Sequence, residues 1–167
     1  FQPIDGNGTE YSVIISGNNL NSGNGRTITA TELVEGKYNI VFSGLNNAGS
    51  PGFSIVQCVT YDTTSPEFTN IVPSANSFVN SKEFSYSLSE DLQSGEIIFQ
   101  SLTSGVNDHS TIISGNNLDS GNHSMVASSL DANAKFNVVF SGVDLAGNSS
   151  TTIVSGLTYD TIAPRVD

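Results

Sequence analysis

The strongest constraint on the fold is an internal repeat that matches without a gap. Tyr61-Asp62-Thr63 aligns with Tyr159-Asp160-Thr161, which gives a period of 159 − 61 = 98 residues. Residues 16–20 align with residues 114–118 at the same offset, and 28 of the 66 aligned positions are identical. A fixed period about one small domain long is typical of tandem arrays, in which every copy folds alike. The chain is therefore expected to contain copies of one building block.

The frame of the repeat predicts the domain organisation. Residues 67–164 form one complete unit, residues 1–66 match only its later part, and residues 165–167 begin another unit. The first domain is thus expected to be partial, without its first two strands. Two explanations remain open: the chain is an excerpt from a longer array, or a neighbouring chain supplies the absent part. The first explanation is favoured.

Apolar and polar residues alternate with a period of two, as in strands whose one face packs on a core. Phe84, Tyr86 and Leu88 alternate with serines, and Phe136, Val138 and Phe140 do the same in a later run. Turn-forming Gly, Asn and Ser separate the runs. In the complete unit the pattern predicts seven strands, near residues 68–73, 82–89, 95–102, 109–114, 123–128, 135–142 and 151–160. The expected fold is all-β: tandem immunoglobulin-like seven-stranded β-sandwiches, the first one incomplete.

Charge and cysteine content exclude several classes of function. Sixteen acidic residues face five Lys and Arg, for a net charge of −11. Nucleic acids and anionic membrane surfaces would repel such a chain, so neither is expected as a partner. No stretch has the length of a transmembrane helix, and no insertion into a membrane is expected. The single cysteine, Cys58, forms no disulfide framework and is expected to be a small buried apolar residue.

Unpaired carboxylates attract hard cations, above all calcium. In an immunoglobulin-like sandwich, two loops lie at the end where the chain enters; here they carry Glu90 with Asp91, and Asp144. Asp62 would be delivered to that same end, and Glu67 follows it closely. These acids could converge on a calcium ion where two repeats join. The alternative is that they are solvated loop acids and turn caps.

Several motifs together resemble the bacterial immunoglobulin-like repeats of giant surface adhesins and related extracellular proteins. They are residues 84–90, residues 136–148 with their Asp-Leu-Ala-Gly-Asn turn, and the closing Tyr-Asp-Thr-x-x-Pro. The resemblance implies a stalk element whose joints are stiffened by calcium in some members. Carried over, the candidate ligands are Asp62, Glu67, Asp91, Asp144 and Asp160. Two departures weaken this: Asn46 replaces the turn acid in the first copy, and Arg165 stands where Glu67 stood.

The function expected from these observations is a structural spacer in an extracellular tandem-repeat protein, anchored at the cell surface and used in adhesion. Its partners would be adjacent repeats of the same chain. The alternative is a subunit of a self-assembling extracellular filament or sheath, whose half domains are completed between chains by strand donation. A carbohydrate-binding module is less favoured because Trp is absent. An enzyme is not expected, since His109 and His123 each occur in only one copy and no catalytic spacing stands out.

Overall fold

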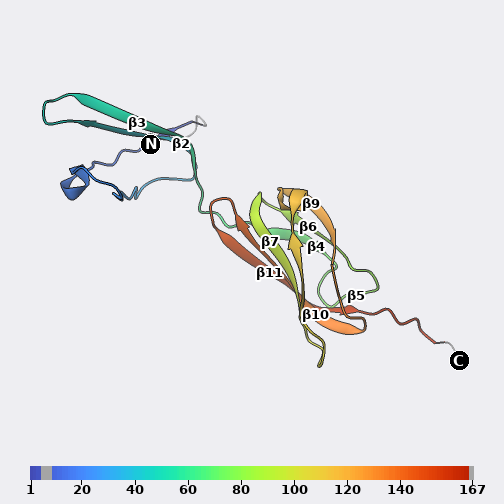
Figure 1. Cartoon of the computed structure of the whole chain (residues 1–167). Coiled ribbons are helices and arrows are strands. Elements are labelled where there is room, and N and C mark those ends of the chain that lie inside the picture. The colour runs from blue at the N-terminus through green and yellow to red at the C-terminus, as the bar shows by residue number, and fades with distance from the viewer. Residues whose placement is uncertain (5–8, 166–167) are drawn as a thin grey trace. The chain divides into compact units, whose positions relative to one another are not determined.

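The structure is a computed structural model that describes residues 1–4 and 9–165. It contains two compact units, unit 1 (Phe1–Thr63) and unit 2 (Thr64–Asp167), shown in Figure 1. The described residues are all-β apart from one short 3-10 turn in each unit, Gly17–Leu20 and Gly115–Leu118. The two units are described one after the other.

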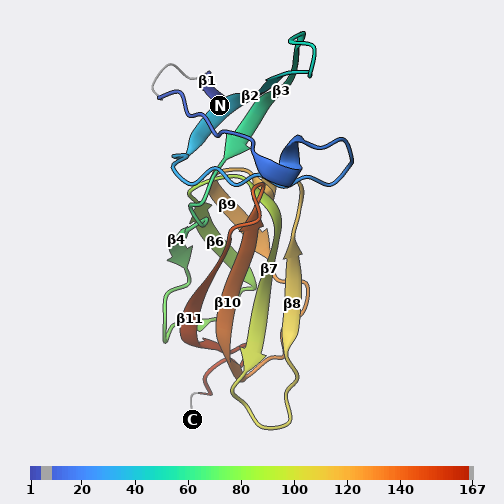
Figure 2. The same cartoon turned by 90° about the vertical axis from the view of Figure 1, so that its left-hand side faces the viewer.

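Unit 2 consists of two sheets (Figure 2). The larger sheet has the order β5-β11-β10-β7-β8, and the smaller one has the order β4-β6-β9. All neighbouring strands are antiparallel except β5 and β11, which are parallel. The strands are β4 (Phe68–Val72), β5 (Phe78–Val79), β6 (Glu83–Leu88), β7 (Leu92–Ser101), β8 (His109–Ile113), β9 (Gly121–Val126), β10 (Ala134–Asp144) and β11 (Ser149–Tyr159).

The core of unit 2 contains the apolar faces of both sheets. Tyr86 of β6 and Phe140 of β10 are almost fully buried, and their ring centroids lie 5.7 Å apart. Phe68 of β4 lies at the same distance from Phe140. Burying an aromatic side chain of this size stabilises a fold by about 1.5–3 kcal/mol. The alternation seen in the sequence therefore forms a packed, sandwich-like core.

Each of the seven ranges predicted to be strands in the complete unit overlaps an observed strand. The structure adds β5, whose two residues pair in parallel with the end of β11. A two-residue strand within a run of Ser and Asn has no period to detect. Its pairing with residues 158 and 159 depends on contacts far along the chain.

Unit 1 contains one three-stranded sheet, with the order β1-β2-β3. Its strands are β1 (Gln2–Pro3), β2 (Gly36–Leu45) and β3 (Pro51–Tyr61). Figure 1 shows β2 and β3 as a long hairpin. Residues 11–15 and 23–28 are outside any strand, although their counterparts at 109–113 and 121–126 are β8 and β9.

The hairpins of the two units share their local structure. Tyr38 pairs with Val59 and Ile40 with Val56, with an irregularity between them; Phe136 pairs with Leu157 and Val138 with Val154, with the same irregularity. The aromatic contacts repeat as well. Phe1 lies edge-on to Tyr38 at 6.4 Å, as Phe99 lies to Phe136 at 6.4 Å. Because the same pairing occurs in both units, the repeated sequence specifies the hairpin locally.

The expectation that Cys58 is buried is wrong, because its side chain is exposed. Cys58 sits at the hairpin irregularity with a φ of 57°, and its backbone N–H donates to Asn39 Oδ1 at 3.2 Å. Its counterpart Gly156 has a φ of 76°, makes the same bond to Asn137, and is buried. The backbone is therefore the same in both units, and only the covering of the hairpin differs.

Candidate functional site

The turn from β10 to β11 is organised around one buried carboxylate. Asp144 is 1% exposed. Its Oδ1 accepts hydrogen bonds from the backbone N–H groups of Ala146, Gly147 and Asn148, at 2.8, 2.6 and 2.8 Å. Its Oδ2 accepts a bond from the Asn148 side-chain amide at 2.8 Å. A carboxylate that accepts several local N–H groups is a strong turn-former.

These contacts set the ionisation of Asp144. Burial by itself would raise the pKa of the carboxyl, because it penalises the charged form. The hydrogen bonds from the Asn148 side chain and from the backbone of Asn148, Gly147 and Ala146 outweigh burial and hold the pKa below its ordinary value. Asp144 is thus ionised at neutral pH and its charge belongs to the turn.

Asp144 also belongs to a small acidic group with Glu90 and Asp62. Glu90 follows β6, and Asp62 follows β3 on the segment that connects the repeats. Each of the three offers one carboxylate oxygen, and these oxygens lie within 4.8 Å of one another. Glu90 and Asp62 are half-buried. Such a group could bind a metal ion, since close carboxylates repel one another unless a cation lies among them.

The donors in this group suit a hard cation. Calcium takes six to eight oxygen ligands at about 2.3–2.6 Å, from carboxylates, amides, carbonyls and water. Three carboxylates supply part of that shell. Soft thiolate or imidazole ligands are absent from this group. Carboxylates of this kind suit hard cations such as magnesium, calcium or manganese.

The other sequence-predicted ligands are not members of this group. Asp91 uses Oδ1 to accept the Ser120 backbone N–H at 2.7 Å. Glu67 is exposed, and its backbone N–H donates to Ser89 Oγ at 2.8 Å. Asp160 follows β11, and its Oδ1 accepts the Ile162 N–H at 2.9 Å. Of the five expected ligands, the structure brings Asp62 and Asp144 together.

The residue that joins them is Glu90, which precedes Asp91 on the same turn. The sequence placed both acids in one loop, and the resemblance selected Asp91 as the ligand, whereas Glu90 is the member of the group with Asp144. The side chains of adjacent residues on a turn point in different directions. Which of the two joins the acidic group depends on the contacts that each side chain makes. Asp91 instead accepts the Ser120 N–H, and no local pattern predicts that contact.

Unit 1 builds the same turn without a charge. Asn46 Oδ1 accepts the backbone N–H groups of Ala48 and Ser50, each at 2.9 Å. The Asn46 N–H bonds to the Ser50 carbonyl at 3.0 Å, as the Asp144 N–H does to that of Asn148 at 2.9 Å. The turn is therefore structural in both units, and the carboxylate of Asp144 adds charge to an element that forms without it.

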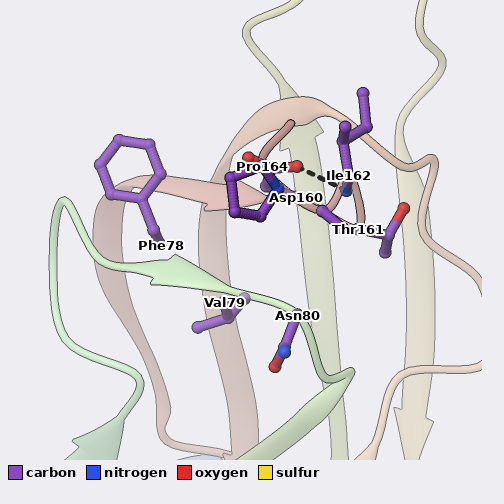
Figure 3. Close-up of a pocket in the computed structure, with 8 residues that line it drawn as sticks. Phe78, Val79, Asn80, Asp160, Thr161, Ile162 and Pro164 are labelled. Atoms are coloured by element: carbon purple, nitrogen blue, oxygen red, sulfur yellow. Dashed lines mark hydrogen bonds between the residues drawn. The ribbon is translucent and has the colours of Figure 1, made fainter. Parts of the chain in front are cut away.

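A recess of about 540 Å³ lies at the end of β11 and offers little chemistry (Figure 3). Phe78, Val79 and Asn80 line one side, and residues 160–164 line the other. Its carboxylate, Asp160, accepts the Ile162 N–H drawn in Figure 3. The recess is open and mainly apolar, and the Asp160 backbone N–H is bonded to Val79. These features are those of a strand end with its following turn.

No protein-family model matches the chain, and comparison with curated proteins finds no match. Among the described residues, no helix has both the length and the apolar character needed to cross a membrane.

Proposed function

We propose that the chain is a structural spacer of an extracellular tandem-repeat protein, a segment of a cell-surface adhesin stalk built from immunoglobulin-like units. One observation carries the proposal. The hairpins of the two units repeat their pairing and bulge residue for residue at an offset of 98, and their strand bounds agree to within one residue. Repetition of one all-β element suits a protein whose length is its function.

The end of each hairpin is tied to its own unit. In unit 1 the Thr63 N–H donates to Glu35 Oε1 at 2.9 Å, just after β3. In unit 2 the Thr161 N–H donates to Asn133 Oδ1 at 3.4 Å, just after β11. The chain then enters a short Pro-containing connection, which has restricted backbone freedom. Each repeat would thus be a rigid link, and the number of links would set the reach of a terminal binding module.

Calcium is the cation proposed for the acidic group of Asp62, Glu90 and Asp144. Three carboxylates with oxygens within 4.8 Å favour a bound cation, and the net charge of −11 attracts one. A ligand that binds only the folded state raises the melting temperature. Thermal unfolding of the chain should therefore shift upward with millimolar calcium and return with chelator. The same calcium on Glu90→Gln should give a smaller shift, and an unchanged curve for the wild type would refute the metal site.

The spacer role is tested by the length of an array. Proteins with two, four and six copies of residues 67–164 would be compared by small-angle X-ray scattering. A stiff spacer should increase its maximum dimension in proportion to the number of copies, whereas flexible joints give growth closer to the square root. A matched series with glycine at residues 162–164 should have a smaller maximum dimension than the native series at each number of copies. Square-root growth in the native series would contradict the spacer.

A second candidate is a subunit of a self-assembling filament or sheath. The exposure of Phe42 (44%) and Phe53 (79%) on the unit 1 hairpin favours it, since exposed apolar strands promote association. Light scattering across a range of protein concentrations distinguishes the two. Growth of β-rich polymers supports the filament, and a monomer at all concentrations supports the spacer.

A further inference from the structure

The unit 1 hairpin exposes an apolar face that its counterpart in unit 2 buries. Phe42 is 44% exposed, whereas its counterpart Phe140 is 0% exposed. Val56 is 47% exposed, and its counterpart Val154 is 8% exposed. These two residues and Ile40 define the open face. The strand pairing and bulge are the same in both hairpins, so the difference arises from what lies on the face.

The covering of the unit 2 hairpin is known in detail. Phe140 contacts Phe68 of β4 and Tyr86 of β6, each at a centroid distance of 5.7 Å. Residues 67–98, which contain both aromatics, have no counterpart in residues 1–63, because the aligned part of the repeat begins at residue 99. The open face therefore corresponds to the position of β4 and β6.

Two other stretches of unit 1 also correspond to strands whose partners lie mainly in residues 67–98. Residues 23–28 correspond to β9, whose partner in unit 2 is β6 over residues 83–88. Residues 11–15 correspond to β8, whose partner is β7 over residues 95–99. Neither unit 1 segment forms a strand, although Ile14, Ile15 and Gly23 are identical to their counterparts. Both segments keep part of the sequence of β8 and β9. Of the residues that pair with β8 and β9 in unit 2, only Phe99 has a counterpart in unit 1, which is Phe1. Phe1 and Tyr11 exchange two backbone hydrogen bonds, at 2.8 and 3.1 Å.

We propose that the open face is a docking surface for the opening segment of another copy of the repeat, a stretch with the residue pattern of residues 67–98. Its two aromatics would cover Phe42, as Phe68 and Tyr86 cover Phe140. Its strand edges would pair with residues 11–15 and 23–28. Main-chain bonds would supply affinity, and alternate side chains would supply specificity, as in other cases of strand addition. The inference does not depend on the spacer role.

The test uses the full chain labelled with ¹⁵N and a synthetic peptide of residues 67–98. Binding should slow amide hydrogen exchange in residues 11–15 and 23–28 and leave unit 2 unchanged. Phe42→Ser should lower the affinity for the peptide by about 30-fold or more, as expected when a central aromatic contact is removed. Phe53→Ser is the matched control: Phe53 pairs with Ser43 beside the Phe42–Ser54 pair, so it faces the opposite side of the sheet. This variant should bind as the wild type does.

A second protein makes the test decisive if the peptide associates with itself. In it, residues 67–98 are fused ahead of Phe1 in the full chain. The fusion should protect residues 11–15 and 23–28, and Phe42→Ser in the fusion should remove much of that protection. Unprotected segments in the fusion would overturn the proposal, as would equal weakening by Phe53→Ser. Association of the unfused chain with itself that Phe42→Ser abolishes would identify a second whole copy as the occupant, and would also overturn it.

Discussion

A glycine in β10 should reveal how tightly the two sheets of unit 2 are packed. Gly142 lies opposite Gly95 of β7. A Cβ placed on Gly142 would lie 2.9 Å from Leu92 Cδ1 and 3.1 Å from the Phe68 ring. Leu92 and Phe68 are 5% and 4% exposed, so both would have to shift within the packed core. Gly142→Ala should therefore destabilise unit 2 by about 1–3 kcal/mol, the range for an extra methyl in a packed core.

That cost corresponds to a fall of about 5–20 °C in the melting temperature of a domain near 100 residues. The assay is thermal unfolding followed by NMR signals assigned to each unit. Gly44 is the matched control, because a Cβ there meets no atom within 4 Å. Gly44→Ala should leave unit 1 unchanged or slightly more stable. A shift below about 2 °C in Gly142→Ala, or an equal loss in Gly44→Ala, would refute the packing argument.

Two further predictions concern pH. The pKa of Asp144 is lowered in the folded state, so its contribution to stability is present above its unfolded pKa of about 4 and is lost as pH falls through the folded value. The free energy of unfolding, measured with urea at pH 7 and pH 3, should fall less in Asp144→Asn than in the wild type. Equal falls would contradict the lowered pKa of Asp144. Burial raises the pKa of Tyr86 to about 12, so above pH 10 the unfolded state loses its phenolic proton first and the wild type should lose stability between pH 10 and 12. Tyr86→Phe should lack that alkaline loss of stability. At pH 7 it should destabilise unit 2 by about 1–2 kcal/mol, because it removes the hydrogen bond from the Tyr86 hydroxyl to the Asn117 carbonyl. The prediction fails if the alkaline stability profile of the variant matches that of the wild type.

The long strands of unit 2 were predictable from the sequence because their pattern is local. In β6, Phe84, Tyr86 and Leu88 alternate with serines, and one face is buried as the period requires. The two-residue β5 was not predictable. Its strand partner is the end of β11, about 80 residues later, and no alternation marks it.

The candidate site was predictable in part. Asp144 was identified from its Asp-x-Ala-Gly-Asn turn, and Asp62 from the motif that closes each repeat. The prediction named Asp91 where the structure has Glu90, and Asp91 Oδ1 accepts the Ser120 N–H at 2.7 Å. That contact joins residues 29 apart, so it is invisible to any local rule.

The sequence by itself determined the repeat, the strands and the turns, because alternation and turn chemistry act over a few neighbouring residues. Only the tertiary structure decided which faces are covered. Phe42 and Phe140 share their neighbours in sequence and their place in the hairpin, yet one is exposed and the other buried. Burial depends on strands that arrive from far along the chain, or from elsewhere, and a residue's own surroundings in sequence carry no record of them.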